Sequence, residues 1–129
     1  MRLRYRREQV FGRIRCLCDS DHVNAKGVSL LTCLLMDDGG TGTDSTIMWL
    51  QKGMAMVQAV SSGKSPNLFW DREDWGAEIR ADEVIIYSQH DDSWIEAISI
   101  VSFGRALSSW YDFLVADDLP IGEIREIVL

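Results

Sequence analysis

Cys16, Cys18, His22 and Cys33 are the side chains near the start of the chain that could bind a metal. Thiolate and imidazole groups are common zinc ligands, and four of them complete a tetrahedral site. Cys16 and Cys18 are two positions apart, so in a strand their thiols would face the same side. However, the C-x-C-x₃-H spacing matches no common zinc module, and apolar neighbours such as Leu17 favour thiols buried in a core. We therefore predict no metal site, and a metal-binding protein or enzyme remains an alternative.

His90, Asp91 and Asp92 form a second cluster, which could act in acid–base chemistry or bind a divalent cation weakly. The chain contains only two histidines, and the sequence supports no nucleophilic triad around either of them. A solvated loop explains this cluster better than catalysis does. We therefore expect no catalytic residue and no cofactor.

Two short segments place tryptophans beside carboxylates. In protein interfaces, desolvated aromatic side chains supply affinity, and the surrounding charges steer an oppositely charged partner. The alternative is that the indoles fold back onto the core. The predicted partner-binding residues are Trp70, Asp71, Glu73, Asp74, Trp75, Asp91, Asp92 and Trp94.

Strands must position both segments. Alternation of apolar and charged residues from 77 to 82 predicts a strand with one buried face. Residues 84–87 and 94–101 are further β-branched and aromatic runs, separated by the polar residues 89–93, and residues 67–70 add a brief strand. The pattern predicts an antiparallel meander with the acidic tryptophan segments at its turns.

Apolar residues at helical spacing predict two amphipathic helices. The first runs from Thr46 to Val60, and Gly63 suits the left-handed position past its end. The second follows Ser102, a candidate N-cap, and extends to Leu114. Their apolar faces should cover the sheet. These faces consist of Ile47, Leu50, Met54, Val57, Val60, Phe103, Ala106, Leu107, Trp110, Phe113 and Leu114.

The two ends of the chain add shorter elements. Residues 9–18 and 27–36 are interpreted as paired strands, although the second run could instead be a short buried helix. Every second residue from Arg2 to Arg6 is an arginine, which favours a strand with a solvated basic side that pairs with the acidic body. The alternative is an arm that binds nucleic acid. Residues 121–129 fit a strand or a helical turn.

Composition restricts the class of protein. The chain has 129 residues, 47% of them hydrophobic, which is typical of one folded domain. No window approaches the run of about 18 apolar residues that would span a membrane. Three cysteines, an odd number, favour reduced thiols, and no apolar segment of a secretory signal follows the basic start. We expect a cytoplasmic protein without a membrane partner.

The net charge of −7 is unevenly distributed. Residues 1–15 contain six arginines and one glutamate, a balance of +5, which leaves −12 for residues 16–129. Such an acidic body repels phosphate backbones and attracts basic proteins. Free nucleic acid is therefore a poor candidate for a direct partner.

Residues 46–115 contain a helix ending in Ser-Gly, a polar segment with an asparagine, the strand pair AEIRADEVIIYS and a strand running into IVSFGRALSSWYDFL. This order of elements resembles the small immunity proteins of bacterial contact-dependent growth inhibition and other polymorphic toxin systems. The resemblance implies a cytoplasmic protein that binds one cognate toxin domain, commonly a basic nuclease. It further implies that the bound protein blocks the toxin's active site or substrate surface and has no catalytic residues.

The sequence thus predicts a single α+β domain over residues 1–129, with an antiparallel sheet of about five strands packed by two amphipathic helices. The expected function is neutralisation of a cognate toxin domain through an acidic, aromatic-bearing surface. The alternatives are the metal protein or enzyme described above, and a structural adaptor subunit whose exposed apolar patches drive oligomerisation.

Overall fold

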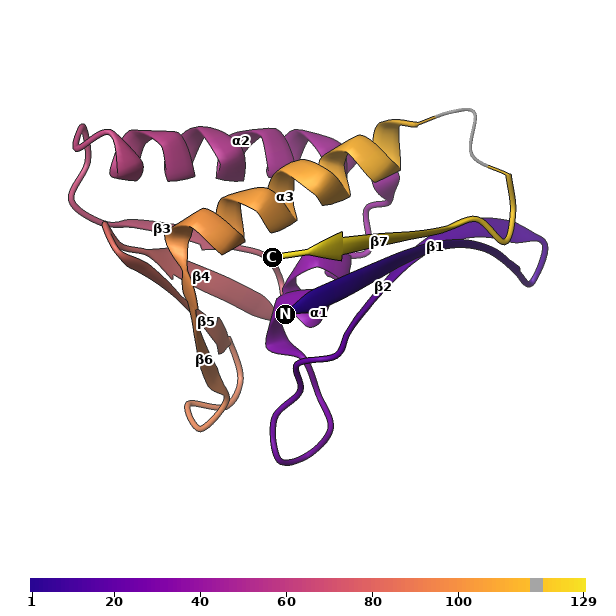
Figure 1. Ribbon diagram of the computed structural model, residues 1–129, viewed down its shortest axis with the longest axis horizontal. Coiled ribbons are helices and arrows are strands. Elements are labelled where there is room, and N and C mark those ends of the chain that lie inside the picture. Colours follow the sequence, from indigo (N-terminus) through magenta and orange to yellow (C-terminus); the bar gives the residue numbers. More distant parts are fainter. Residues whose placement is uncertain (117–119) are drawn as a thin grey trace.

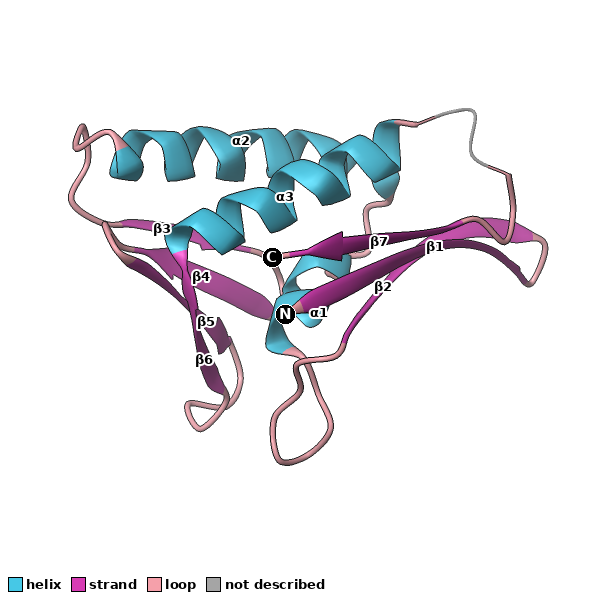
Figure 2. Ribbon diagram, in the orientation of Figure 1, coloured by secondary structure: helices cyan, strands magenta, loops and turns pink. Residues whose placement is uncertain are grey.

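The computed structural model describes residues 1–116 and 120–129, which form two antiparallel sheets and three helices (Figures 1 and 2). One sheet has the strand order β2-β1-β7 and the other has the order β3-β4-β5-β6. The strands are β1 (Arg2–Val10), β2 (Arg13–Ser20), β3 (Leu68–Asp71), β4 (Trp75–Ile79), β5 (Glu83–Ser88), β6 (Ile95–Ser99) and β7 (Ile124–Val128). The helices are α1 (Leu30–Met36), α2 (Thr43–Ser61) and α3 (Ile100–Val115).

The α+β class and the small size agree with the prediction, but the described residues contain seven strands in two sheets and one helix more than expected. The long helices α2 and α3 pack against each other on one side of the two sheets, and α1 lies between the sheets (Figure 1). The core therefore has a helical layer above and a divided β layer below.

The meander prediction is confirmed by the four-stranded sheet. Leu68 pairs with Ile79, Ile79 with Val84, and Val84 with Ile98, so these residues form one row facing the core. The strand β6 then runs directly into α3, because Ser99 has extended backbone angles and its hydroxyl accepts the N–H of Ser102 at 3.1 Å. The N-cap is therefore Ser99, three residues before the predicted one.

The predicted apolar face of α3 is also confirmed. Phe103, Ala106, Leu107, Trp110 and Phe113 are all buried. The indole N–H of Trp110 donates to the carbonyl of Leu35 at 3.0 Å, and its ring meets that of Tyr5 edge-on at 5.0 Å. Trp110 thus joins α3 to both α1 and β1.

The helix α2 begins at Thr43, three residues earlier than predicted, after Gly42 as N-cap. Gly53 faces Trp70 so closely that an added Cβ would lie 2.5 Å from the indole. A side chain at this position would collide with the ring, and Gly53 is therefore required for α2 to pack on β3. Gly63 has a φ of 80°, which confirms its predicted place past the helix end.

The predicted strand pair over residues 9–18 and 27–36 is wrong. The second run is α1, whose first turn is capped by the Ser29 hydroxyl, and the alternative of a short buried helix is correct. The first run contains a hairpin turn at Phe11 and Gly12, and β1 pairs with β2. Both turn residues have positive φ, 50° and 77°, as a two-residue hairpin turn requires.

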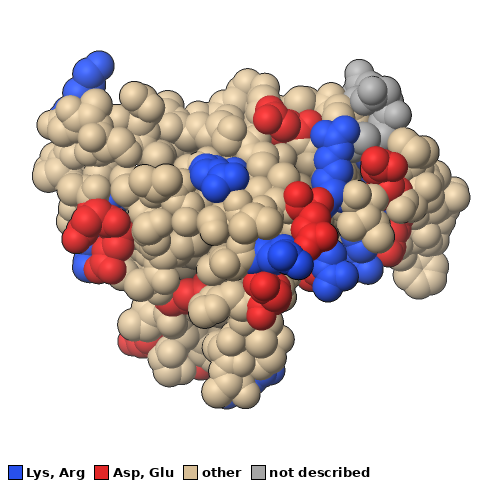
Figure 3. Space-filling view, viewed as in Figure 1, with Lys and Arg blue, Asp and Glu red and all other residues tan. Residues whose placement is uncertain are grey.

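The predicted arginine strand is confirmed as β1. Leu3 and Tyr5 are buried, whereas outward arginines form exposed ion pairs. These pairs are Arg2 with Glu126 at 2.8 Å, Arg4 with Asp19 at 3.6 Å, and Arg6 with Glu8 at 3.3 Å. Basic and acidic side chains consequently alternate on this face of the molecule (Figure 3).

Arg7 departs from the solvated pattern, because its side chain faces the core. Its guanidinium donates to the carbonyl of Ala116 at 2.8 Å and to that of Phe113 at 3.3 Å. A cation is favourable at a helix C-terminus, where unpaired carbonyls concentrate negative charge. Arg7 therefore fixes the end of α3 to β1.

Candidate protein-binding surface

The turn between β3 and β4 and the loop between β5 and β6 lie at the same end of the four-stranded sheet. The pairing of Trp75 with Ser88 and of Tyr87 with Ile95 places them side by side. We call this region the acidic hairpin surface. Its carboxylate residues are all exposed, and two half-buried tryptophans accompany them. The members are Asp71, Glu73, Asp74, Trp75, Asp91, Asp92 and Trp94.

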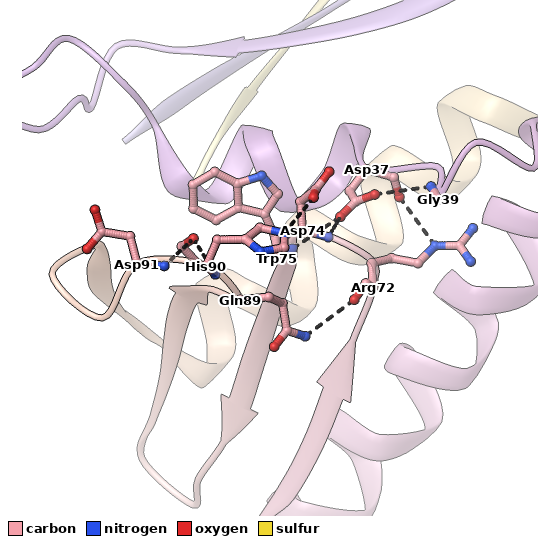
Figure 4. A network of polar contacts seen from close by, with 9 residues as sticks. Asp37, Gly39, Arg72, Asp74, Trp75, Gln89, His90 and Asp91 are labelled. Atoms are coloured by element: carbon pink, nitrogen blue, oxygen red, sulfur yellow. Dashed lines mark hydrogen bonds and ion pairs between the residues drawn. The ribbon is translucent and has the colours of Figure 1, made fainter.

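Hydrogen bonds tie the turn to the loop (Figure 4). The backbone N–H of Gln89 donates to the carbonyl of Asp74 at 2.8 Å, and its side-chain amide donates to the carbonyl of Arg72 at 3.3 Å. The His90 imidazole lies 2.8 Å from the Asp74 carboxylate. The two connections therefore present one surface rather than two separate loops.

Asp37, immediately after α1, anchors this surface to the interior (Figure 4). Its Oδ2 accepts the backbone N–H groups of Asp74 at 2.9 Å and Trp75 at 3.2 Å, while Oδ1 accepts that of Gly39 at 3.1 Å. Hydrogen bonds from N–H groups to a carboxylate are stronger than those between neutral groups. No local pattern in the sequence indicates Asp37, because its bond to Asp74 spans 37 positions.

Arg72 is the basic residue inside the acidic turn, and it is directed away from the surface. Its guanidinium lies over the Trp49 ring at 4.9 Å. Its N–H groups donate to the carbonyls of Asp37 at 3.3 Å and Asp38 at 3.1 Å. The positive charge is thus used to hold the end of α1, and the exposed groups of the turn are mainly acidic.

The tryptophans of the predicted set divide into two kinds. Trp75 and Trp94 are half-buried and meet edge to face, with ring centroids 6.2 Å apart. The Lys26 ammonium lies 5.1 Å from the centre of the Trp94 ring. Both indoles therefore keep part of their surface exposed at this end of the sheet.

The prediction that Trp70 contributes to a binding surface is wrong. Its side chain is only 1% exposed, it stacks on Trp49 at 3.7 Å, and its N–H donates to the Trp49 carbonyl at 3.0 Å. In the strand β3 the side chain at position 70 faces the core, whereas its neighbour Asp71 faces out. Trp70 is therefore a core residue, as the alternative interpretation held.

Besides Asp74, two further carboxylates of the surface have specific partners. The Asp71 carboxylate accepts the hydroxyl of Tyr87, and burial together with this bond raises the pKa of that hydroxyl. The side-chain and backbone donors of Ser93 lower the pKa of the Asp91 carboxyl. Asp91 consequently carries its negative charge at neutral pH.

The proposed zinc ligands lie on different elements. Cys16 and Cys18 are on β2, Cys33 is on α1, and His22 is in the connection between them. Within residues 1–116 and 120–129, no group of three or more metal-ligating side chains could hold an ion. Burial raises the pKa of the Cys18 and Cys33 thiols, which favours the protonated form over the thiolate that zinc requires.

His22 instead lies beside Glu96, whose Oε1 is 3.8 Å from the imidazole Nε2. Glu96 occupies the core-facing row of the edge strand β6, opposite Ile86, and its side chain is 10% exposed. Burial raises the pKa of this carboxyl. Charged residues that point inward on edge strands oppose pairing with a further strand, and Glu96 fits this structural role.

Comparison of the chain with protein-family models, curated proteins and solved structures found no match. Among the described residues, the helices are too short or too polar to cross a membrane. The acidic hairpin surface, by its geometry and charge, is therefore the candidate functional site.

Proposed function

We propose that the acidic hairpin surface binds a basic protein domain and that the chain acts as an immunity protein, a stoichiometric inhibitor of a cognate toxin domain. The observation that carries this proposal is the position of five exposed carboxylate residues, one at the end of β3 and four on two connections that hydrogen bonds hold together. The five residues are Asp71, Glu73, Asp74, Asp91 and Asp92.

The anchoring by Asp37 supports a binding role, because the turn is ordered before a partner arrives. Binding costs conformational entropy when loops and side chains must be ordered, and a preformed surface reduces that cost. The two N–H bonds to Asp37 hold the turn in place, and the Arg72 side chain points away from the surface. Both features favour a rigid, acidic surface. A basic partner would bind this surface with little rearrangement of the turn or the loop.

The two half-buried indoles supply the apolar part of such an interface. Interfaces concentrate their binding energy in a few aromatic and charged residues, and peripheral charge mainly accelerates association. Trp75 directly follows the acidic turn, Trp94 ends the loop, and the two rings meet edge to face, so they fit the first role. The carboxylates around them fit the second.

Reversing charge at Glu73 and Asp92 tests the proposal without removing a described side-chain hydrogen bond. The double variant Glu73→Lys, Asp92→Lys should slow association with the cognate basic toxin domain by about tenfold or more, while thermal stability stays nearly unchanged. Association would be measured by surface plasmon resonance and stability by thermal denaturation.

The matched control is Asp82→Lys, Asp112→Lys, which makes the same change in net charge at exposed residues outside the acidic hairpin surface. Asp82 lies in the turn between β4 and β5, at the opposite end of the sheet. Equal slowing by both double variants would mean that net charge alone matters. Unchanged association in the first variant would place the interface elsewhere.

A further inference from the structure

The strand β2 is an edge of its sheet, and one side of it can accept another strand. The N–H of Arg7 donates to Glu123 at 3.4 Å and its carbonyl accepts from Gly122 at 2.7 Å, so this residue of β1 bonds toward β7. In an antiparallel sheet the bonding direction alternates along a strand. The alternate residues Arg6, Glu8 and Val10 of β1 therefore bond to β2. Their partners there are Leu17, Arg15 and Arg13.

The residues between those partners must direct their backbone groups away from β1. Cys18 confirms this direction, because its N–H donates to the Met36 sulfur at 3.3 Å, outside the sheet. Ile14 and Cys16 have the same parity along β2, so their N–H and C=O groups also point to the open side. The contact with Met36 closes the edge at Cys18, which leaves residues 13–17 as the open stretch.

A groove of about 770 Å³ runs beside this open stretch. One wall is the hairpin of β1 and β2, which projects past α1 in Figure 1, and the other comes from the helices. The apolar lining from the helices is Leu35, Met36, Trp110 and Leu114. An added strand would place every second side chain against this lining, since side chains alternate between the two faces of a strand.

The positive charge beside the groove determines which kind of added strand would bind there. Arg13 and Arg15 are exposed and lie on the outer side of β2. Asp38 also lines the groove, but its carboxylate accepts the N–H of Gly40 at 2.8 Å within its own turn. Cross-strand pairs of opposite charge are stabilising, so the strand should carry carboxylates on its outer side.

A second copy of this chain fits the edge poorly. Symmetric antiparallel pairing centred on the open stretch would place Arg15 opposite Arg15 of the other copy, and like charges directly opposite are destabilising. Exposed cations on an edge strand are a known device against such self-pairing. The edge is thus more suited to a strand of different composition.

We propose that the open edge of β2 and the adjoining groove bind an extended segment of a partner protein by strand addition, and that this segment alternates acidic with apolar side chains. The backbone groups of Ile14 and Cys16 would form hydrogen bonds with the added strand. Arg13 and Arg15 would favour acidic side chains in that strand, and the groove would contact its apolar side chains. This site carries the opposite charge to the acidic hairpin surface and does not depend on that surface's proposed role.

The direct test is NMR titration of the isotope-labelled full chain with a short blocked peptide of alternating glutamate and valine. The amide signals of Ile14 and Cys16 should shift, and their hydrogen exchange should slow by about tenfold. A matched peptide of alternating lysine and valine should have little effect. No change at Ile14 and Cys16 with millimolar glutamate peptide, or equal binding of both peptides, overturns the proposal.

Ile14→Pro removes the outward N–H at a position where an edge strand tolerates proline. This variant should weaken binding of the glutamate peptide by about tenfold. The control Ile14→Val keeps the N–H and should not weaken binding. The double variant Arg13→Glu, Arg15→Glu should reverse the preference in favour of the lysine peptide. This second result does not depend on proline being accepted. An unchanged preference, or a homodimer that Ile14→Pro dissociates, contradicts the assignment.

Discussion

The tip of the β1–β2 hairpin and the acidic hairpin surface are both made of antiparallel connections, but they are supported in different ways. At the tip, Phe11 is fully exposed and a two-residue turn closes the hairpin. At the acidic surface, Asp37 accepts backbone N–H groups of the turn, and Gln89 bonds the loop to it. One region thus offers backbone groups along an edge, and the other offers carboxylates on an anchored surface.

This difference suggests how one small domain can present surfaces of opposite charge. The outward cations of β1 form ion pairs with carboxylates of the same sheet. Arg13 and Arg15 of β2 do not belong to those pairs. In the acidic turn, the one cation, Arg72, is withdrawn beneath the surface. Local pairing, more than the overall charge, therefore decides which sign each region exposes.

The largest expected effect comes from Trp110, which packs against β1 of the hairpin from the helical layer. Trp110→Ala should lower the free energy of unfolding by about 3 to 5 kcal/mol, because it removes a buried indole that contacts Tyr5 and bonds to Leu35. Chemical denaturation measures this loss. Trp94→Ala, at the half-buried rim, is the control and should cost much less. Similar losses for both variants would contradict the difference between core and rim.

Removing the anchor of the acidic surface should have the next largest effect. Asp37→Ala leaves the N–H groups of Asp74 and Trp75 without their carboxylate, and should lower the free energy of unfolding by about 2 kcal/mol. Hydrogen exchange at those two amides should accelerate, while the amide of Tyr5 in β1 keeps its protection. Equal acceleration in both sheets would show that Asp37 supports the whole fold instead of this one surface.

Glu96 provides a test that depends on pH. Burial raises the pKa of this carboxyl above its ordinary value of 4.5, so the folded state binds the proton more tightly than the unfolded state does. Its contribution to stability is therefore present below pH 4.5 and is lost as the pH rises through the folded pKa. Relative to Glu96→Gln, the natural chain should lose stability across that interval in denaturation series. A pH-independent difference would contradict the raised pKa.

The smallest effect is expected for an exposed ion pair on the other sheet. Glu126→Gln breaks the contact with Arg2 and should change the free energy of unfolding by less than about 1 kcal/mol. Salt should reduce even this difference, because both side chains are about half exposed. A larger, salt-resistant loss in thermal denaturation would mean that these pairs hold the sheet together as firmly as Asp37 holds the acidic turn.

Regular patterns in the sequence predicted several elements correctly. Alternation in β4 and the helical spacing from Phe103 to Phe113 both identify buried faces, because each depends only on the period of the local backbone. The run from Leu30 to Met36 was ambiguous, since a short, wholly apolar segment has no period that separates helix from strand. The turn after β1 was also missed, because Phe11 has a positive φ, which is uncommon for a bulky residue.

The candidate surface was only partly predictable. The sequence located its acidic residues, since charge on a turn between strands is exposed in most folds. It did not distinguish Trp70 from Trp75 and Trp94, because the depth of an indole depends on what packs over it, and here Trp49 and Gly53 of α2 cover Trp70. The same reason explains why Asp37 and the inward direction of Arg72 were missed.

The sequence by itself determined the α+β class, the meander, the two long helices and the basic start of an otherwise acidic chain, because these follow from local periodicity and composition. Tertiary structure alone decided the division into two sheets, the joining of two hairpin ends by Asp37 and Gln89, and the open edge of β2. Each of these depends on groups far apart in the chain, and their proximity is set by packing that no local pattern encodes.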